Sequence, residues 1–140
     1  MRREALDSII SHITLGTNDY DRAAIFYDAA LKPLGFSRVA KPAGKPPMYA
    51  VDGAMPHLYL YKPYDGQPAT WGNGTHIAFQ ASTRDAVNSF YNEAIANGGT
   101  DEGLPGIREE YSSDYYAAYV RDPDGNKLQV VCYEQRVLTP

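Results

Sequence analysis

The sequence predicts an α+β fold made of two copies of one βαβββ unit. Three observations support this prediction. The second half of the chain repeats the first at a displacement of 64 residues, from His12 to His76. Each copy contains one helical segment with a clear apolar face, and strand-like runs lie on both sides of each helical segment.

The repeat is visible in short strings of sequence. SHITL in the first copy corresponds to THIAF in the second, and FYDAAL corresponds to FYNEAI, without a gap. The strand-rich ends of the copies align at a displacement of 70 residues, which matches Tyr59 with Gln129. The sequence therefore predicts a duplicated unit in which equivalent residues occupy equivalent places.

The two helical segments share one apolar spacing. Apolar residues recur at i, i+3, i+4, i+7 and i+8 from Ala23 in the first copy and from Val87 in the second, which is typical of an amphipathic helix. Side-chain caps and glycine terminators are expected at the ends of both helices. These residues are Asn18 or Asp19 with Gly35 in the first copy, and Ser82 or Thr83 with Gly98 and Gly99 in the second.

Each helix is expected to follow one strand and to precede three. The runs are SIISHITL, GFSRVAK, PPMYAVD and HLYLYKP in the first copy, and THIAFQA, GLPGIREEY, YYAAYVRD and NKLQVVCYE in the second. GLPGIREEY is poor strand material because Pro105 and two glycines interrupt it, and DPDGN has the residues of a tight turn. We expect one domain over 1–140, with modules over about 7–63 and 74–134, joined by a loop.

Composition argues against several classes of protein. The chain has 140 residues and a net charge of −4 without a run of like charges, so no nucleic-acid partner is expected. No apolar stretch approaches the roughly 18 residues that cross a bilayer, and we expect no signal peptide. Cys132 is the only cysteine, which suits a cytoplasmic protein, and we expect it to fill an apolar place in a strand.

The duplication gives two histidines symmetric positions. If equivalent strands meet around a pseudo-twofold axis, His12 faces His76, and Tyr59 faces Gln129. Neutral imidazole is the commonest protein ligand for metals, so one hypothesis is a metal held by the two histidines. The alternative is that they form hydrogen bonds in a cup without a metal. For Gln129, the alternative to metal ligation is a polar pocket wall.

Aromatic residues suggest a ligand pocket. The chain has 12 tyrosines, and several fall in strands that would line a shared cup, where they would suit a planar or partly apolar small molecule. Strand alternation places His57, Tyr59 and Tyr61 on one face, and either face of the sheet could be the concave one. The residues expected to line the pocket are His57, Tyr49, Tyr59, Tyr61 and Tyr119.

The chain resembles the vicinal oxygen chelate superfamily, which includes glyoxalase I, extradiol dioxygenases, fosfomycin-resistance enzymes and bleomycin-resistance proteins. The resemblance covers nearly the whole chain and rests on SHITL, FYDAALKPLGF, GTHIAF and YVRDPDGNKLQVV. It implies a glyoxalase-like cup of curved mixed sheets around a divalent metal such as zinc, nickel, iron or manganese. The implied ligand positions fall on His12, Tyr59, His76 and Gln129, and we expect His12, His76 and Gln129 to hold the metal.

The sequence departs from the family pattern at two of these positions. Metal-dependent members usually have a carboxylate at the position of Gln129, although some glyoxalases use Gln, and glyoxalases often have a carboxylate at the position of Tyr59. An amide is a weaker metal ligand and cannot accept a proton, so no catalytic residue is assigned.

Two functions follow from the resemblance. The first, favoured by ancestry, is a metal-dependent lyase or dioxygenase acting on a small oxygenated substrate. The second is a metal-free small-molecule-binding protein of the bleomycin-resistance type. Cups in this family form within one chain or between two chains by module exchange, and a homodimer is expected.

Overall fold

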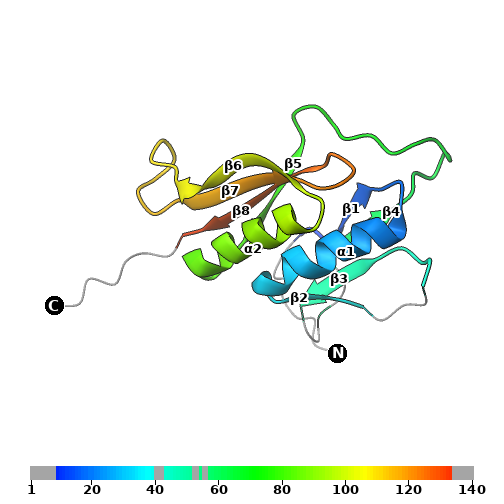
Figure 1. Cartoon of the computed structure of the whole chain (residues 1–140), viewed down its shortest axis with the longest axis horizontal. Helices are drawn as coiled ribbons and strands as arrows, with labels where there is room; N and C mark the ends of the chain where they lie inside the picture. The colour runs from blue at the N-terminus through cyan, green and yellow to red at the C-terminus, as the bar shows by residue number, and fades with distance from the viewer. Residues whose placement is uncertain (1–8, 40–42, 52–53, 55–56, 134–140) are drawn as a thin grey trace.

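The computed structural model describes residues 9–39, 43–51, 54 and 57–133. The chain forms two βαβββ modules (Figure 1). Module 1 consists of β1 (Ile13–Gly16), α1 (Tyr20–Leu31), the short 3-10 helix η1 (Lys32–Leu34), β2 (Phe36–Arg38), β3 (Met48–Val51) and β4 (Leu58–Tyr61). Module 2 consists of β5 (His76–Gln80), α2 (Arg84–Ala96), β6 (Thr100–Ile107), β7 (Tyr116–Arg121) and β8 (Lys127–Cys132).

Each module forms a four-stranded mixed sheet of the same topology. The strand order is β1-β4-β3-β2 in module 1 and β5-β8-β7-β6 in module 2. In both sheets the first strand is parallel to the last, and the other neighbours are antiparallel. β1 and β5 are thus edge strands of two separate sheets. These findings confirm the predicted α+β fold of two βαβββ modules.

The helices begin at two of the predicted caps. The side chain of Asp19 accepts a hydrogen bond of 3.0 Å from a backbone N–H in the first turn of α1. Thr83 does the same for α2, also at 3.0 Å. Gly35 ends η1 and Gly98 follows α2, both with a positive φ that favours glycine.

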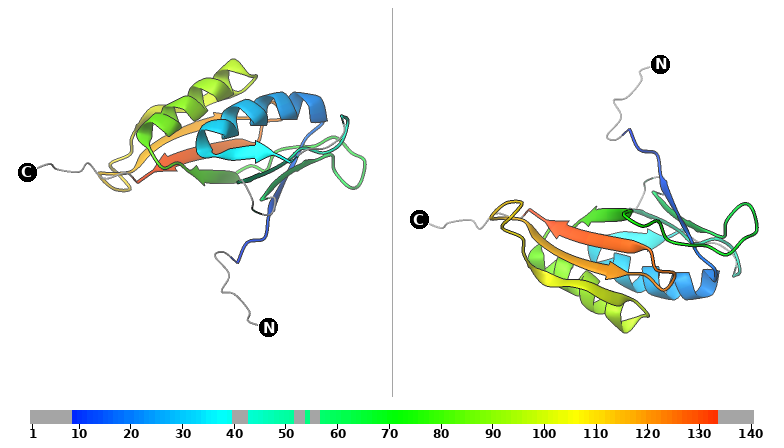
Figure 2. Two further views of the ribbon diagram at one scale, coloured as in Figure 1. Left: turned by 90° about the horizontal axis from the view of Figure 1, so that it is seen from below. Right: turned by 90° about the horizontal axis from the view of Figure 1, so that it is seen from above.

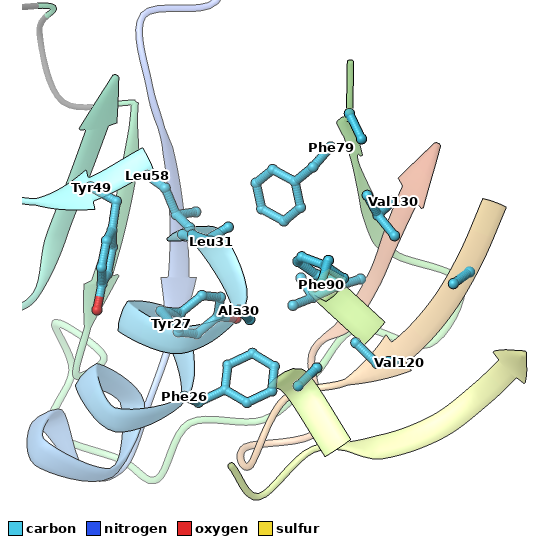
Figure 3. Packing of buried hydrophobic residues seen from close by; sticks show 14 of the residues in the cluster. Phe26, Tyr27, Ala30, Leu31, Tyr49, Leu58, Phe79, Phe90, Val120 and Val130 are labelled. Atoms are coloured by element: carbon cyan, nitrogen blue, oxygen red, sulfur yellow. The ribbon is translucent and has the colours of Figure 1, made fainter. Parts of the chain in front are cut away.

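The two helices lie side by side, and each also contacts the sheet of its own module (Figure 2). Their apolar faces meet in one core, in which Phe26 and Phe90 are fully buried. Figure 3 shows these rings with Phe79 between the two modules. The predicted face of α1 is entirely buried, whereas Ile95, near the end of the α2 face, is 39% exposed.

β6 is the largest difference from the predicted secondary structure. The run with Pro105 and two glycines was poor strand material, yet Thr100–Ile107 forms an eight-residue strand. Its register with β7 shifts between Asp101 and Gly103 and again between Gly103 and Gly106. An edge strand tolerates proline and such irregularities because only one of its sides is paired.

The segment that joins the modules contacts module 2 through Trp71. The Arg121 guanidinium lies 4.8 Å from the Trp71 ring centroid, which is a cation–π geometry. Gly125 also approaches the ring closely, since a Cβ there would lie 2.5 Å from Trp71 Cδ1. Elsewhere, Cys132 fills a buried place in β8 as expected. Neither described helix has the length and apolar run needed to cross a bilayer.

The β7–β8 turn of module 2 binds the start of α1 in module 1. Asp124 accepts hydrogen bonds from the Thr17 hydroxyl at 2.6 Å and from the Asn18 backbone N–H at 2.9 Å. It also forms an ion pair with Arg22 at 2.5 Å. The string DPDGN is therefore more than the tight turn that the sequence predicts, because it joins the two modules.

Asp122 is the buried part of this junction, with 4% of its surface exposed. Its carboxylate accepts hydrogen bonds from the Tyr27 hydroxyl at 2.5 Å and from two backbone N–H groups of the turn at 2.9 Å. The Asn126 side chain donates to Asp122 and to the Gly16 carbonyl at the end of β1, both at 2.9 Å. Burial raises the pKa of Asp122 above 3.8, while the hydrogen bonds from Tyr27 and Asn126 oppose that rise.

We predict that Tyr27→Phe lowers the free energy of unfolding at neutral pH by about 1–3 kcal/mol, because a buried carboxylate loses a donor. The pKa of Asp122 should also rise further, and carboxyl-carbon NMR would measure it. A folded-state pKa above the unfolded value means that stability is gained as the pH falls through the folded pKa. The deficit of the variant should therefore shrink on acidification.

Tyr91→Phe is the matched control for this experiment. Tyr91 is equivalent to Tyr27 in the repeat, but its hydroxyl donates to the exposed Asp101 at 3.0 Å. Its loss should change the free energy of unfolding by less than about 0.5 kcal/mol. Equal losses in the two variants would contradict the assigned role of Asp122.

Candidate functional site

The candidate site consists of two groups of residues on the sheet faces turned away from the core. In β4, Leu58 and Leu60 point into the core, so that Tyr59 and Tyr61 point to the other face. In β5 and β8, Phe79 and Val130 are core residues (Figure 3). Alternation therefore puts the residues on either side of them on the outward face.

Half-site 1 is the group His12, His57, Tyr59 and Tyr61 on module 1. The His12 and Tyr59 rings are stacked, with centroids 4.4 Å apart and planes inclined by 25°. The Ser11 hydroxyl lies 3.0 Å from Nδ1 of His12. Nε2 of His12 has no hydrogen-bond partner among the described residues and is available to a ligand.

Two surface depressions adjoin half-site 1. One, of about 600 Å³, is lined by residues that include His12, Thr14, Tyr59 and Tyr61. The other, of about 260 Å³, is lined in part by His12 and His57. The two histidines come together because the backbone N–H of Ile13 donates to the His57 carbonyl at 2.8 Å.

Half-site 2 is the group His76, Tyr115, Tyr119 and Gln129 on module 2. Gln129 is 3% exposed, and both ends of its amide are hydrogen-bonded. Its Oε1 lies 3.1 Å from Nε2 of His76, and its Nε2 donates to the Tyr115 hydroxyl at 2.5 Å. The Tyr119 ring packs edge-on to His76 at 6.3 Å, and burial raises the pKa of Tyr119.

The two half-sites are equivalent under the repeat. In each, the histidine at the start of the first strand or just before it contacts the residue of the last strand that the alignment pairs with it. This residue is Tyr59 for His12 and Gln129 for His76. Tyr115 was not among the residues expected from the sequence. Nothing in the sequence distinguishes it from the other tyrosines of its run. It lies just before β7, and its side chain reaches Gln129 although the register partner of Gln129 is Tyr119.

Tyr49 lies elsewhere than the sequence analysis expected. It is fully buried against α1, where its hydroxyl donates to Asp28 at 2.8 Å. Burial and this hydrogen bond raise its pKa well above the usual tyrosine range. The phase of β3 turns Tyr49 toward the helix and Met48 to the face that carries Tyr59, so Tyr49 does not line the candidate site.

The described residues make no hydrogen bond or ring contact between half-site 1 and half-site 2. β1 and β5, which position His12 and His76, are not paired with each other. The modules instead meet through their helices, through the β7–β8 turn, and through the Phe36 and Phe79 rings at 6.2 Å. Among the described residues, the contacts that assemble each half-site therefore lie within one module, and no strand pairing links the two histidines.

The side chains of the half-sites fit a divalent metal poorly. Gln129 is uncharged and its amide is already hydrogen-bonded at both ends, while Nε2 of His76 is engaged with it. No group of three His, Cys, Asp or Glu side chains that could hold a metal occurs among the described residues. Imidazoles with a neutral amide bind zinc or iron less well than sets with a carboxylate. Ligation by His12, His76 and Gln129 stays a prediction.

The family model of the Glyoxalase/Bleomycin resistance protein/Dioxygenase superfamily matches residues 9–130. The chain belongs to this superfamily. A glyoxalase/bleomycin resistance protein from Albidiferax ferrireducens T118 is 39% identical, with a TM-score of 0.77 over 89% of this chain and 98% of that chain.

More distant members of the superfamily share the fold. A glyoxylase/bleomycin resistance protein/dioxygenase domain from Frankia sp. EAN1pec is 14% identical, with a TM-score of 0.70 over 95% and 96% of the two chains. A lactoylglutathione lyase from Agrobacterium tumefaciens is 23% identical, with a TM-score of 0.58 over 91% and 95%. Among curated proteins, none matches significantly.

We predict that Gln129→Glu strengthens the binding of Co²⁺ by at least about tenfold, because a carboxylate replaces a neutral amide beside His76. Isothermal titration of tag-free protein would measure the affinity, and the visible spectrum would report the coordination geometry. Adding His76→Ala to this variant should abolish the gain. Tight stoichiometric binding by the unaltered chain would contradict the poor fit described above.

Proposed function

We propose that this superfamily member binds a small molecule, without a metal, between half-site 1 of one copy and half-site 2 of a second copy. The observation that carries the proposal is the position of the two histidines. His12 directly precedes edge strand β1 and His76 begins edge strand β5, and neither edge is paired within the described chain.

Unpaired edges favour association with a second copy. An edge strand presents free backbone N–H and C=O groups that can meet another chain. Residues 9–12, directly before β1, extend away from the sheets (Figure 2), and Ile9 is 97% exposed. A twofold dimer that brings half-site 1 against half-site 2 does so twice, because the contact is reciprocal. Two equivalent sites per dimer would result.

The chemistry of the half-sites favours binding over metal-dependent catalysis. Half-site 1 offers a stacked ring pair and the open Nε2 of His12. Half-site 2 offers aromatic rings and a buried amide whose hydrogen bonds are complete without a metal. Such a mixture of aromatic surface and a few placed polar groups is typical of small-molecule sites. The ligand would be partly planar and would carry hydrogen-bonding groups.

A complementation experiment tests this proposal. Thr14 and Ala78 are equivalent in the repeat and exposed on the outward faces, so Thr14→Glu should block half-site 1 and Ala78→Glu should block half-site 2. Each variant alone should fail to bind the planar anionic probe 8-anilinonaphthalene-1-sulfonate. A one-to-one mixture should regain about a quarter of the sites, because half of the dimers are mixed and one of their two sites is intact.

Light scattering supplies the control for this experiment. The unaltered chain and both variants should be dimers. No regained fluorescence from mixed dimers would contradict a site shared between copies, and a monomeric unaltered chain that binds the probe would contradict it as well.

A further inference from the structure

We propose that half-site 2 recognises a small planar carboxylate, with Arg108 and Lys127 binding the anion beside Tyr119. The inference rests on the proposed function, since it names the class of ligand. Both cationic side chains lie close to the Tyr119 ring. Arg108 Cζ lies 5.6 Å and Lys127 Nζ 5.5 Å from the centroid of the Tyr119 ring.

Arg108 is fixed before any ligand arrives. Its Nη1 donates to the Gly106 carbonyl at 2.9 Å, and its Nη2 donates to the Leu104 carbonyl at 2.7 Å. These bonds use two of the five N–H donors of a guanidinium, and the remaining donors can bind a carboxylate in the two-pronged manner that arginine favours. Little side-chain entropy is lost on binding when the group is already held.

Glycines in β6 make room for this arrangement. Gly103 pairs with Tyr119 across the sheet. A Cβ at Gly103 would lie 3.0 Å from the Tyr119 side chain and 3.3 Å from Nη2 of Arg108. A Cβ at Gly106 would lie 3.2 Å from Nη1. The irregular, glycine-containing β6 thus lets the guanidinium reach back over the tyrosine ring.

Lys127 places a second positive charge over the Tyr119 ring. It is the register partner of His76, so the two are neighbours on the outward face. Among the described residues, neither Lys127 nor Arg108 forms an ion pair with a carboxylate, whereas Arg22, Arg38 and Arg121 each do. Two unneutralised cations on a chain with a net charge of −4 provide local complementarity to an anion.

The surrounding side chains favour a planar ligand. Tyr111 and Tyr115, with ring centroids 4.9 Å apart, offer an aromatic surface near Tyr119. Ala78, beside Gln129 in the register, is small and exposed, which leaves space above the sheet. Nδ1 of His76 has no partner among the described residues and can hydrogen-bond a further oxygen of the ligand.

Three probes of similar size test the inference on the full-length protein. Benzoate is planar and anionic, cyclohexanecarboxylate is anionic without an aromatic ring, and benzamide is planar and neutral. Isothermal titration should show that benzoate binds at least about tenfold more tightly than either of the others. Cyclohexanecarboxylate binding as well as benzoate would overturn the planar requirement, and benzamide binding as well would overturn the anion requirement.

Substitutions of Lys127 and Arg108 test whether these two side chains bind the carboxylate of benzoate. Lys127→Gln and Arg108→Gln should each weaken benzoate binding by about tenfold and leave benzamide binding unchanged, whereas Lys127→Arg should retain benzoate binding. Lys32→Gln, on η1 beside the helices, is the matched control and should change nothing. An unchanged benzoate affinity in Lys127→Gln and Arg108→Gln would overturn the assignment.

Together, the complementation experiment and the probe titrations distinguish a failure of this inference from a failure of the proposed function. If the complementation experiment succeeds and benzamide binds as tightly as benzoate, only the class of ligand is wrong. If 8-anilinonaphthalene-1-sulfonate and all three probes fail to bind, the proposed binding function fails together with the inference.

Discussion

The Asp122 carboxylate is almost completely buried, and the contact between the two modules depends on its hydrogen bonds. A charged group so buried is costly unless hydrogen bonds replace its hydration. Here the donors come from Tyr27 in module 1 and from the turn that follows Asp122 in module 2. The same turn sets the start of β8 and holds the end of β1 through Asn126. One buried carboxylate therefore links the end of β1, beside half-site 1, to the start of β8, which carries Gln129 of half-site 2.

The two modules use the same framework for different contacts. At equivalent positions, His12 stacks on an aromatic ring whereas His76 hydrogen-bonds an amide. The first contact depends on dispersion and ring electrostatics and is nearly indifferent to which nitrogen carries the proton. The second fixes the imidazole through one nitrogen, with Tyr115 holding the amide from the other side. Duplication has thus produced one face suited to stacking and one suited to directional polar recognition.

Much of the fold could be predicted because the repeat and the helix periodicity are strong signals. The sequence could not show which residues of β3 face the core. Met48, Tyr49, Ala50 and Val51 are all apolar, so no alternation of apolar and polar residues marks the buried face. The strand β6 could not be predicted either, because its irregular pairing depends on packing at the sheet edge and not on strand propensity. The contact of Tyr115 with Gln129 and the junction at Asp122 also escaped prediction. The first is a side-chain contact from outside β7, and the second depends on which elements form the contact between the modules.

Half-site 1 and half-site 2 each form contacts within their own module, and no hydrogen bond or ring contact joins them among the described residues. The sequence places the equivalent histidines on equivalent strands, but it does not say which surfaces of the two units meet inside one chain. In the structure, the two helices and the β7–β8 turn form the contact between the two units. The edges of β1 and β5 are unpaired in the described chain, and under the proposed function a second copy would complete the pocket there.

The position of Trp71 has a practical consequence. The chain has one tryptophan, and its indole ring lies against Arg121 and Gly125 at the turn that joins the modules. A cation held over the ring and close backbone contact both alter the electric field and polarity that determine indole emission. Fluorescence from this single indole is thus an internal optical reporter of inter-module docking, and no label has to be introduced.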